Sequence, residues 1–167
     1  MYKILTRIAT ITTAMGFYAA INWMIDYVLY ASIIWYLGPI SGGCLLAAVM
    51  FIVDLLTIRF YDWAKTDWLA IEYAKESLDA GYLARYSSLV RSRYRRLWLA
   101  LCVIILSIKF NPFIVTIVMR NGTRTYNGLE KRDWIIFVTS HIIGQIYWIG
   151  VISGGVGVIR SIYGSIF

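Results

Sequence analysis

Residues 59–96, RFYDWAKTDWLAIEYAKESLDAGYLARYSSLVRSRYRR, form the one long polar stretch of the chain and separate two pairs of strongly apolar runs. The two runs before it meet at Gly38-Pro39, and the two after it are joined by the polar loop 121–133. A bilayer core about 30 Å thick needs roughly 20 apolar residues per helix. We therefore predict an all-α polytopic membrane protein with four transmembrane helices, arranged as two hairpins that a cytoplasmic helical hairpin joins.

The composition supports a membrane protein, because 60% of the 167 residues are hydrophobic, only 15% are charged and the mean hydropathy is +0.68. This balance is far from that of a soluble globular domain. The net charge of +7 comes from basic residues close to the apolar runs. We expect them to meet anionic lipid headgroups rather than nucleic acid. One helical membrane domain, residues 1–167, accounts for the whole chain.

We place the four spans at about residues 8–37, 40–58, 97–119 and 134–159, with the connector at 59–96 and an outer loop at 120–133. Gly38-Pro39 breaks the first span from the second, since glycine permits a turn and proline restricts the residue before it. So short a connection makes these two spans antiparallel neighbours. Pro112 should kink the third span. The first run is too long for a signal sequence, so we expect it to be a retained span.

The connector carries apolar residues at spacings of three and four, which is typical of a helix. We predict that the second span continues as a helix to about Asp79, and that a second helix returns from about Tyr82 into the third span. The two arms would then project from the membrane. The alternative is that they lie flat in the interface, with Tyr61, Trp63, Trp68 and Tyr73 among the headgroups.

The distribution of lysine and arginine predicts the orientation of the chain. With four spans, both termini and the connector lie on one side, and that side carries most of the basic residues: Lys3, Arg7, Arg59, Lys65, Lys75, Arg85, Arg91, Arg93, Arg95, Arg96 and Arg160. Only Arg120, Arg124, Lys131 and Arg132 fall on the other side. The positive-inside rule then puts both termini in the cytoplasm of a bacterial inner membrane, or in the matrix of a mitochondrial one.

Polar residues occur deep inside the predicted spans: Asn22, Asp26, Lys109, His141 and Gln145. Asp26, Lys109 and Gln145 each lie about 11 residues from the outer end of their span, roughly 16 Å at helical rise. Because a lone charge at that depth is costly, we predict that Asp26 and Lys109 pair with each other. The pair either fixes helix assembly, forms part of a proton or ion path with His141, or lines a water-filled pocket that binds a ligand.

Two further sets of residues are candidates for interaction. Small residues repeat at spacings of four and three in the fourth span, and we call them the glycine seam: Gly150, Gly154, Gly157, Ser161 and Gly164. We expect another helix to pack there at close range. A basic cluster precedes the third span: Arg85, Arg91, Arg93, Arg95 and Arg96. We expect it to anchor the chain beside lipid phosphates or to dock a soluble partner.

No catalytic residues, metal ligands or cofactor motif are expected. His141 is the only histidine and has no cysteine at ligand spacing, and Cys44 and Cys102 lie at opposite depths, too far apart for a disulfide. We therefore predict a non-enzymatic structural subunit of a larger membrane complex or homo-oligomer, whose partners are lipids and other subunits or copies of itself. The alternative is a small oligomeric channel for protons or ions, and a membrane enzyme ranks third.

Overall fold

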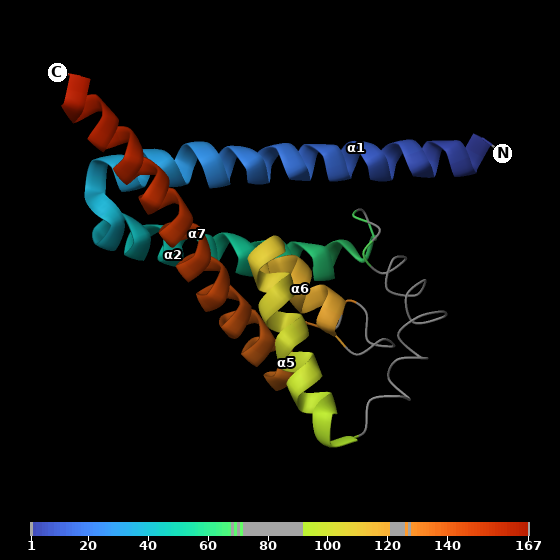
Figure 1. The fold of residues 1–167 in the computed structure, drawn as a ribbon. Helices are drawn as coiled ribbons and strands as arrows, with labels where there is room; N and C mark the ends of the chain where they lie inside the picture. Colours follow the sequence, from blue (N-terminus) through green and yellow to red (C-terminus); the bar gives the residue numbers. More distant parts are fainter. Residues whose placement is uncertain are drawn as a thin grey trace.

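The computed structural model describes residues 2–67, 69, 71, 92–120, 126 and 128–166, and these form helices joined by short irregular segments (Figure 1). The elements are α1 (Tyr2–Met24), η1 (Ile25–Leu29), α2 (Tyr30–Ala64), α5 (Ser92–Lys109), α6 (Pro112–Met119) and α7 (Lys131–Ile166). Two helical stretches are long and apolar enough to cross a membrane, Thr12–Ala64 and Lys131–Gly164. The chain is therefore all-helical where it is described, with two candidate membrane-spanning helices.

The first of these stretches is broken where the sequence predicts a break. Gly38 leaves the helical region with φ of 78° and ψ of 169°, directly before Pro39. That positive φ is open to glycine and strained for other residues. After the turn the chain returns against itself, because a Cβ on Gly42 would lie 3.1 Å from the carbonyl oxygen of Ile33. The end of the first run and the start of the second are thus in backbone contact.

The helix before that break contains one turn of π-helix, which the sequence analysis did not anticipate. It is η1, which joins α1 to α2 and holds Asp26. A π turn inserts an extra residue into the α-helical ladder and shifts the faces of the helix that follow. The face on which Asn22 lies and the face on which Tyr30 lies are therefore offset from the register that a regular α-helix would give.

The second half of α2 packs antiparallel to α7. A Cβ on Gly43 would meet Ile149 at 3.1 Å, the ring of Phe51 lies 5.2 Å from that of Phe137, and Ile58 shares a buried cluster with Phe137. Rising numbers on α2 thus match falling numbers on α7. The end of α2 lies beside the start of α7, and the Gly38 turn lies toward the end of α7 (Figure 1).

The predicted third span, residues 97–119, is not one kinked helix. It consists of α5 and α6, which are separated at Phe110 and Asn111. Val103 and Val115 pack in the same cluster with Ile136 of α7, a contact that a continuous helix could not make across twelve residues. Pro112 begins α6 instead of kinking α5, so the chain reverses there. α5 runs parallel to α7, and α6 runs back toward the start of α7.

The predicted projecting arm also needs correction. α2 ends at Ala64, where Lys65 adopts a left-handed conformation with φ of 48°, and does not continue toward Asp79. Leu69 and Ile71 are buried in a cluster with residues of α2, α6 and α7. These apolar side chains pack against the side chains of the helices, so the start of the connector folds back over the helical bundle. The rest of the connector prediction, the return helix from Tyr82 included, falls on residues 72–91 and lies outside the described residues.

Candidate functional site

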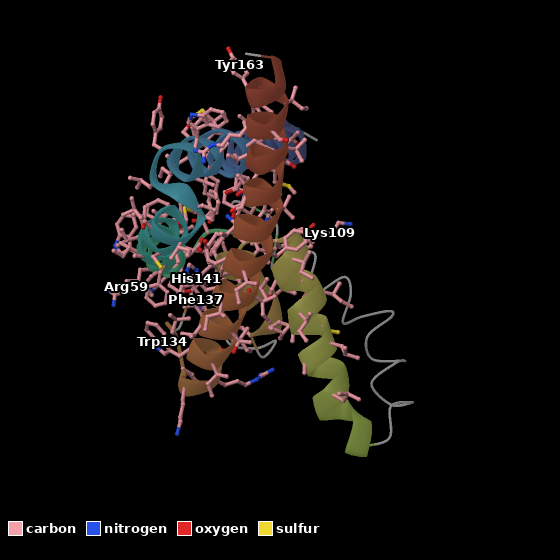
Figure 2. The ribbon with its side chains drawn as sticks, turned by 60° about the vertical axis from the view of Figure 1, so that its left-hand side comes forward. Arg59, Lys109, Trp134, Phe137, His141 and Tyr163 are labelled. Carbon is pink, nitrogen blue, oxygen red and sulfur yellow. The ribbon has the colours of Figure 1, made fainter. Side chains whose placement is uncertain are left out.

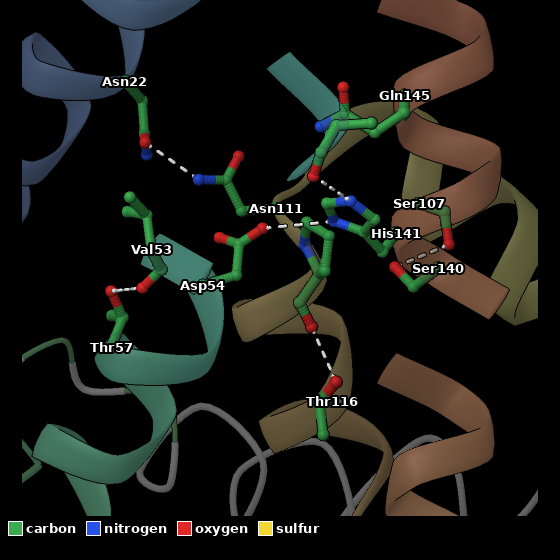
Figure 3. Close-up of polar contacts among 12 residues, drawn as sticks. Asn22, Val53, Asp54, Thr57, Ser107, Asn111, Thr116, Ser140, His141 and Gln145 are labelled. Carbon is green, nitrogen blue, oxygen red and sulfur yellow. Dashed lines mark hydrogen bonds and ion pairs between the residues drawn. The ribbon is translucent and has the colours of Figure 1, made fainter. Parts of the chain in front are cut away.

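Several of the predicted intramembrane polar residues form hydrogen bonds between helices (Figure 3). The Asn111 side-chain amide donates to the Asn22 Oδ1 at 2.8 Å, which ties the α5–α6 turn to α1. The Tyr30 hydroxyl donates to the Gln145 Oε1 at 2.8 Å, which ties the first half of α2 to α7. Asn22 and Gln145 therefore form polar contacts between helices, with partners other than those expected, and the role of these contacts stays a prediction.

The predicted pair of Asp26 and Lys109 does not form. Lys109 is the last residue of α5 and is exposed, and Figure 2 shows its side chain pointing away from α7. Asp26 is half-buried and has no ion-pair partner among the described residues. The equal depths were counted along straight spans, whereas the reversal before Pro112 leaves Lys109 at the tip of a helical hairpin. The polar residue that reaches α1 from this tip is Asn111.

His141 contacts α2 through both ring nitrogens. Its Nε2 lies 3.0 Å from the carbonyl oxygen of Ala47, and its Nδ1 lies 3.6 Å from the Asp54 Oδ2. Both side chains are buried, with 4% of Asp54 and 6% of His141 exposed. The aromatic rings of Phe51 and Phe137 flank the imidazole. This is a buried acid–imidazole pair between the two longest helices.

Asp54 is a site residue that the sequence analysis did not include among the deep polar residues. It is buried and paired with a histidine. The signal was its spacing, because Asp54 shares one helix face with residues that are all buried or half-buried: Ala47, Met50, Ile58 and Tyr61. A carboxylate on the apolar, inward-facing side of a helix needs a partner inside the bundle.

A second polar contact lies between α5 and α7. The Ser107 hydroxyl is 2.9 Å from the Ser140 hydroxyl and also donates to the carbonyl of Val103. Both serines are fully buried. Close approach is possible because Gly144 faces the same place, where a Cβ would lie 3.2 Å from the Ser107 carbonyl oxygen. Small residues here let two helices meet almost backbone to backbone.

Arg120 joins three helix ends, which the sequence analysis did not foresee because it placed this residue in an outer loop. Its guanidinium donates two hydrogen bonds to Asp62, at 2.6 and 3.0 Å, and its Nε lies 3.9 Å from Asp133. Only 4% of Arg120 is exposed. Asp133 also accepts a hydrogen bond from the backbone of Glu130 and so caps the start of α7. The ends of α2 and α6 and the start of α7 are thereby held together.

The glycine seam lies on the second half of α7, on a face that no other described part of the chain covers. A Cβ on Gly150, Gly154, Gly157 or Gly164 would have nothing within 4 Å, and Ser161 is exposed. The predicted close contact with another helix is therefore not made within the described part of this chain. By contrast, Gly43 and Gly144, which were not assigned to the seam, sit in tight helix contacts.

The predicted basic cluster is described only in part. Arg93, Arg95 and Arg96 lie in the first turns of α5, whereas Arg85 and Arg91 lie outside the described residues. The prediction that these arginines meet lipid phosphates or a soluble partner stays a prediction. Cys44 is exposed and Cys102 half-buried, and neither is in a disulfide.

Metal chemistry finds no support in the described residues. Within them, no group of three or more histidine, cysteine, aspartate or glutamate side chains is placed to hold a metal ion.

Comparison with protein-family models, with curated proteins and with solved structures found no match. Any functional argument must therefore rest on the contacts and exposed surfaces of the described residues.

Proposed function

We propose that this chain is a non-enzymatic integral membrane protein that acts as a structural subunit, either of a larger membrane complex or of a homo-oligomer. The observation that carries the proposal is the open glycine seam on α7. The helix continues past Ile149 to Ile166 with a face of glycines that no described side chain covers. In lipid, apolar side chains give little drive for association, so helices associate where small residues allow close van der Waals packing.

A second open surface supports the same role. The described side chains along the last turns of α1 are large, apolar and mostly exposed, as at Phe17 and Trp23, with 69% and 61% of their surface exposed. The N-terminal part of α1 extends beyond the other helices (Figure 1). Lipid tails or the helices of a partner suit such a surface, whereas water does not.

The fold supports a topology with three full crossings and a re-entrant hairpin. α1 and the first half of α2 cross together, the second half of α2 returns, α7 crosses again, and α5–α6 enters and leaves on one side. Irregular backbone at membrane depth is tolerated where protein contacts it, and in this turn Asn111 is half-buried and hydrogen-bonded to Asn22. In this topology the C-terminal end of α7 lies opposite the N-terminus, unlike in a four-span arrangement.

The positive charges support this topology better than the four-span one. The side with the connector then also carries Arg120, Arg124, Lys131 and Arg132, and Lys109 lies at the hairpin tip. Arg160 alone is left for the opposite side, where it stacks on Trp35 and donates a hydrogen bond to its carbonyl beside the Gly38 turn. The positive-inside rule places the connector in the cytoplasm or matrix, in a bacterial or mitochondrial inner membrane. Its arginine cluster then faces anionic lipid headgroups.

The test compares two neighbouring glycines on α7. Gly154 lies in the glycine seam, and Gly155 is equally open but lies about 100° around the helix. Gly154→Leu should abolish co-purification of partner subunits or copies in lipid discs, because the leucine holds the helices apart. Gly155→Leu changes helix propensity equally and should leave the assembly intact. A wild-type particle that contains one chain and no other polypeptide would refute the proposal.

A further inference from the structure

The geometry of the buried pair of Asp54 and His141 determines which of their atoms can carry a proton. The His141 Nε2 faces the carbonyl oxygen of Ala47 at 3.0 Å. A carbonyl oxygen only accepts hydrogen bonds, so Nε2 carries its hydrogen. The state of the pair is then decided entirely at the other nitrogen, Nδ1, which lies 3.6 Å from the Asp54 Oδ2.

Three arrangements are conceivable at this contact. One proton can sit on Nδ1, giving an imidazolium beside a carboxylate, or on Asp54, giving two neutral groups; both arrangements leave the pair without net charge. With no proton, the lone pair of Nδ1 faces the oxygens of a carboxylate, and a full negative charge is buried. Among the described side chains no lysine or arginine lies in ion-pair range of Asp54. An uncompensated charge at such a site is strongly disfavoured.

The residues around Asp54 and His141 make the negatively charged form of the pair still less favourable. Phe51 and Phe137 contact the imidazole ring and exclude water from it. Among the described residues, the other titratable groups near Asp54 are Tyr18 on α1, Asp26 in η1 and Tyr30 on α2, none of which supplies a positive charge. α6 carries no titratable residue, and Lys109 on α5 points away (Figure 2). A second carboxyl nearby, that of Asp26, only adds to the cost of a bare carboxylate.

We propose that Asp54 and His141 form a binding site for a single proton, and that the bound proton holds α2 against α7. Uptake of the proton joins the two side chains as a neutral pair. Release leaves two groups that repel each other across the interface between the longest helices, so the helices separate locally. The site couples the protonation of the bundle to its packing, and it requires no partner subunit.

The single histidine of the sequence makes the proton directly observable. Selective ¹⁵N labelling of histidine in lipid discs reports His141 alone, and infrared difference spectra report whether Asp54 is protonated. At neutral pH we expect either a doubly protonated imidazole or a protonated Asp54 carboxyl, and in Asp54→Asn the loss of that signal. A singly protonated imidazole beside an ionised Asp54 at neutral pH overturns the proposal.

The coupling between protonation of the pair and helix packing is measured as the distance between α2 and α7. Spin labels at Val49 on α2 and Ile142 on α7, both exposed, are introduced after Cys44 and Cys102 are replaced by serine. The distance between labels should stay constant while the pair keeps its proton and lengthen when alkaline pH removes it. The double variant Asp54→Asn/His141→Gln, which has no titratable group at this contact, should make the distance independent of pH. Ser107→Ala, which alters a neighbouring contact only, should keep the wild-type response. A constant distance while the proton is lost overturns the coupling.

Discussion

The two halves of α7 have similar apolar composition but opposite surroundings. In the first half, from Lys131 to Ile149, Phe137 and Ser140 are fully buried against α2, α5 and α6. In the second half, Val158 and Ile159 are more than half exposed. The glycines show the same contrast, because Gly144 is pressed against Ser107 whereas Gly154 meets nothing. The first half packs on three helices, whereas the second half contacts the rest of the chain through residues such as Val156 and Arg160 and leaves its glycine face available to a partner.

The largest expected effect comes from removing the ring at the centre of the packed half. Phe137→Ala should cost about 3 to 5 kcal/mol of unfolding free energy, because Phe51 and Trp134 lose a contact that nothing refills. Ile159→Ala in the open half should change it by less than about 0.5 kcal/mol. Reversible unfolding in mixed detergent micelles measures both. Equal losses would abolish the distinction between the halves.

A substitution of Arg120 tests whether the packing of the first half of α7 depends on the ion pairs that hold its start. Arg120→Gln should cost about 3 kcal/mol, because Asp62 and Asp133 are left without their shared cation. The double variant with Asp62→Asn should recover part of that loss, since it removes one stranded carboxylate. A loss below about 1 kcal/mol would mean that the start of α7 is held by apolar packing alone.

The same substitution at two glycines should have different signs. Gly144→Ala puts a methyl group 3.2 Å from a backbone oxygen that cannot move aside, so we expect a loss of about 1 to 2 kcal/mol. Gly155→Ala meets nothing and gains helix propensity, so it should be neutral or stabilising by up to about 1 kcal/mol. Thermal unfolding in detergent compares them, and a destabilising Gly155→Ala would argue that this face is packed within the chain.

The smallest expected effect concerns the serine contact. A double-mutant cycle of Ser107→Ala and Ser140→Ala should give a coupling of about 0.6 kcal/mol, as is common for hydrogen bonds between membrane helices. A coupling indistinguishable from zero would leave Gly144 as the sole reason why α5 and α7 approach so closely.

A structural feature could be predicted from the sequence where the interaction that determines it joins residues close together in the chain. The break at Gly38 was predicted correctly because positive φ and the following proline are properties of neighbouring residues. The division at Pro112 was read as a kink, whereas the chain reverses, because the hydrogen bond from Asn111 to Asn22 and the packing of Val115 on Val103 join residues distant in sequence. The Asp26–Lys109 pair failed for the same reason.

The candidate site could be predicted from the sequence only in part. His141 and Gln145 were singled out by their polarity and depth, but Asp54, the partner of His141, was not, since it lies near the end of its predicted span. Its place on the same face as Met50 and Ile58 was the better guide. The glycine seam was singled out by its spacing, and packing of another helix on it stays a prediction, because that depends on where the other helices lie.

The most direct test of the central claim is whether something covers the glycine seam in the membrane. With Cys44 and Cys102 replaced by serine, single cysteines at Gly154 and Gly155 are compared for their rate of reaction with a small membrane-permeant maleimide. We predict slower reaction at Gly154→Cys in intact membranes, and equal rates after a harsh detergent dissociates the assembly. Equal rates in the intact membrane would show both glycines facing lipid and would contradict a subunit role for the second half of α7.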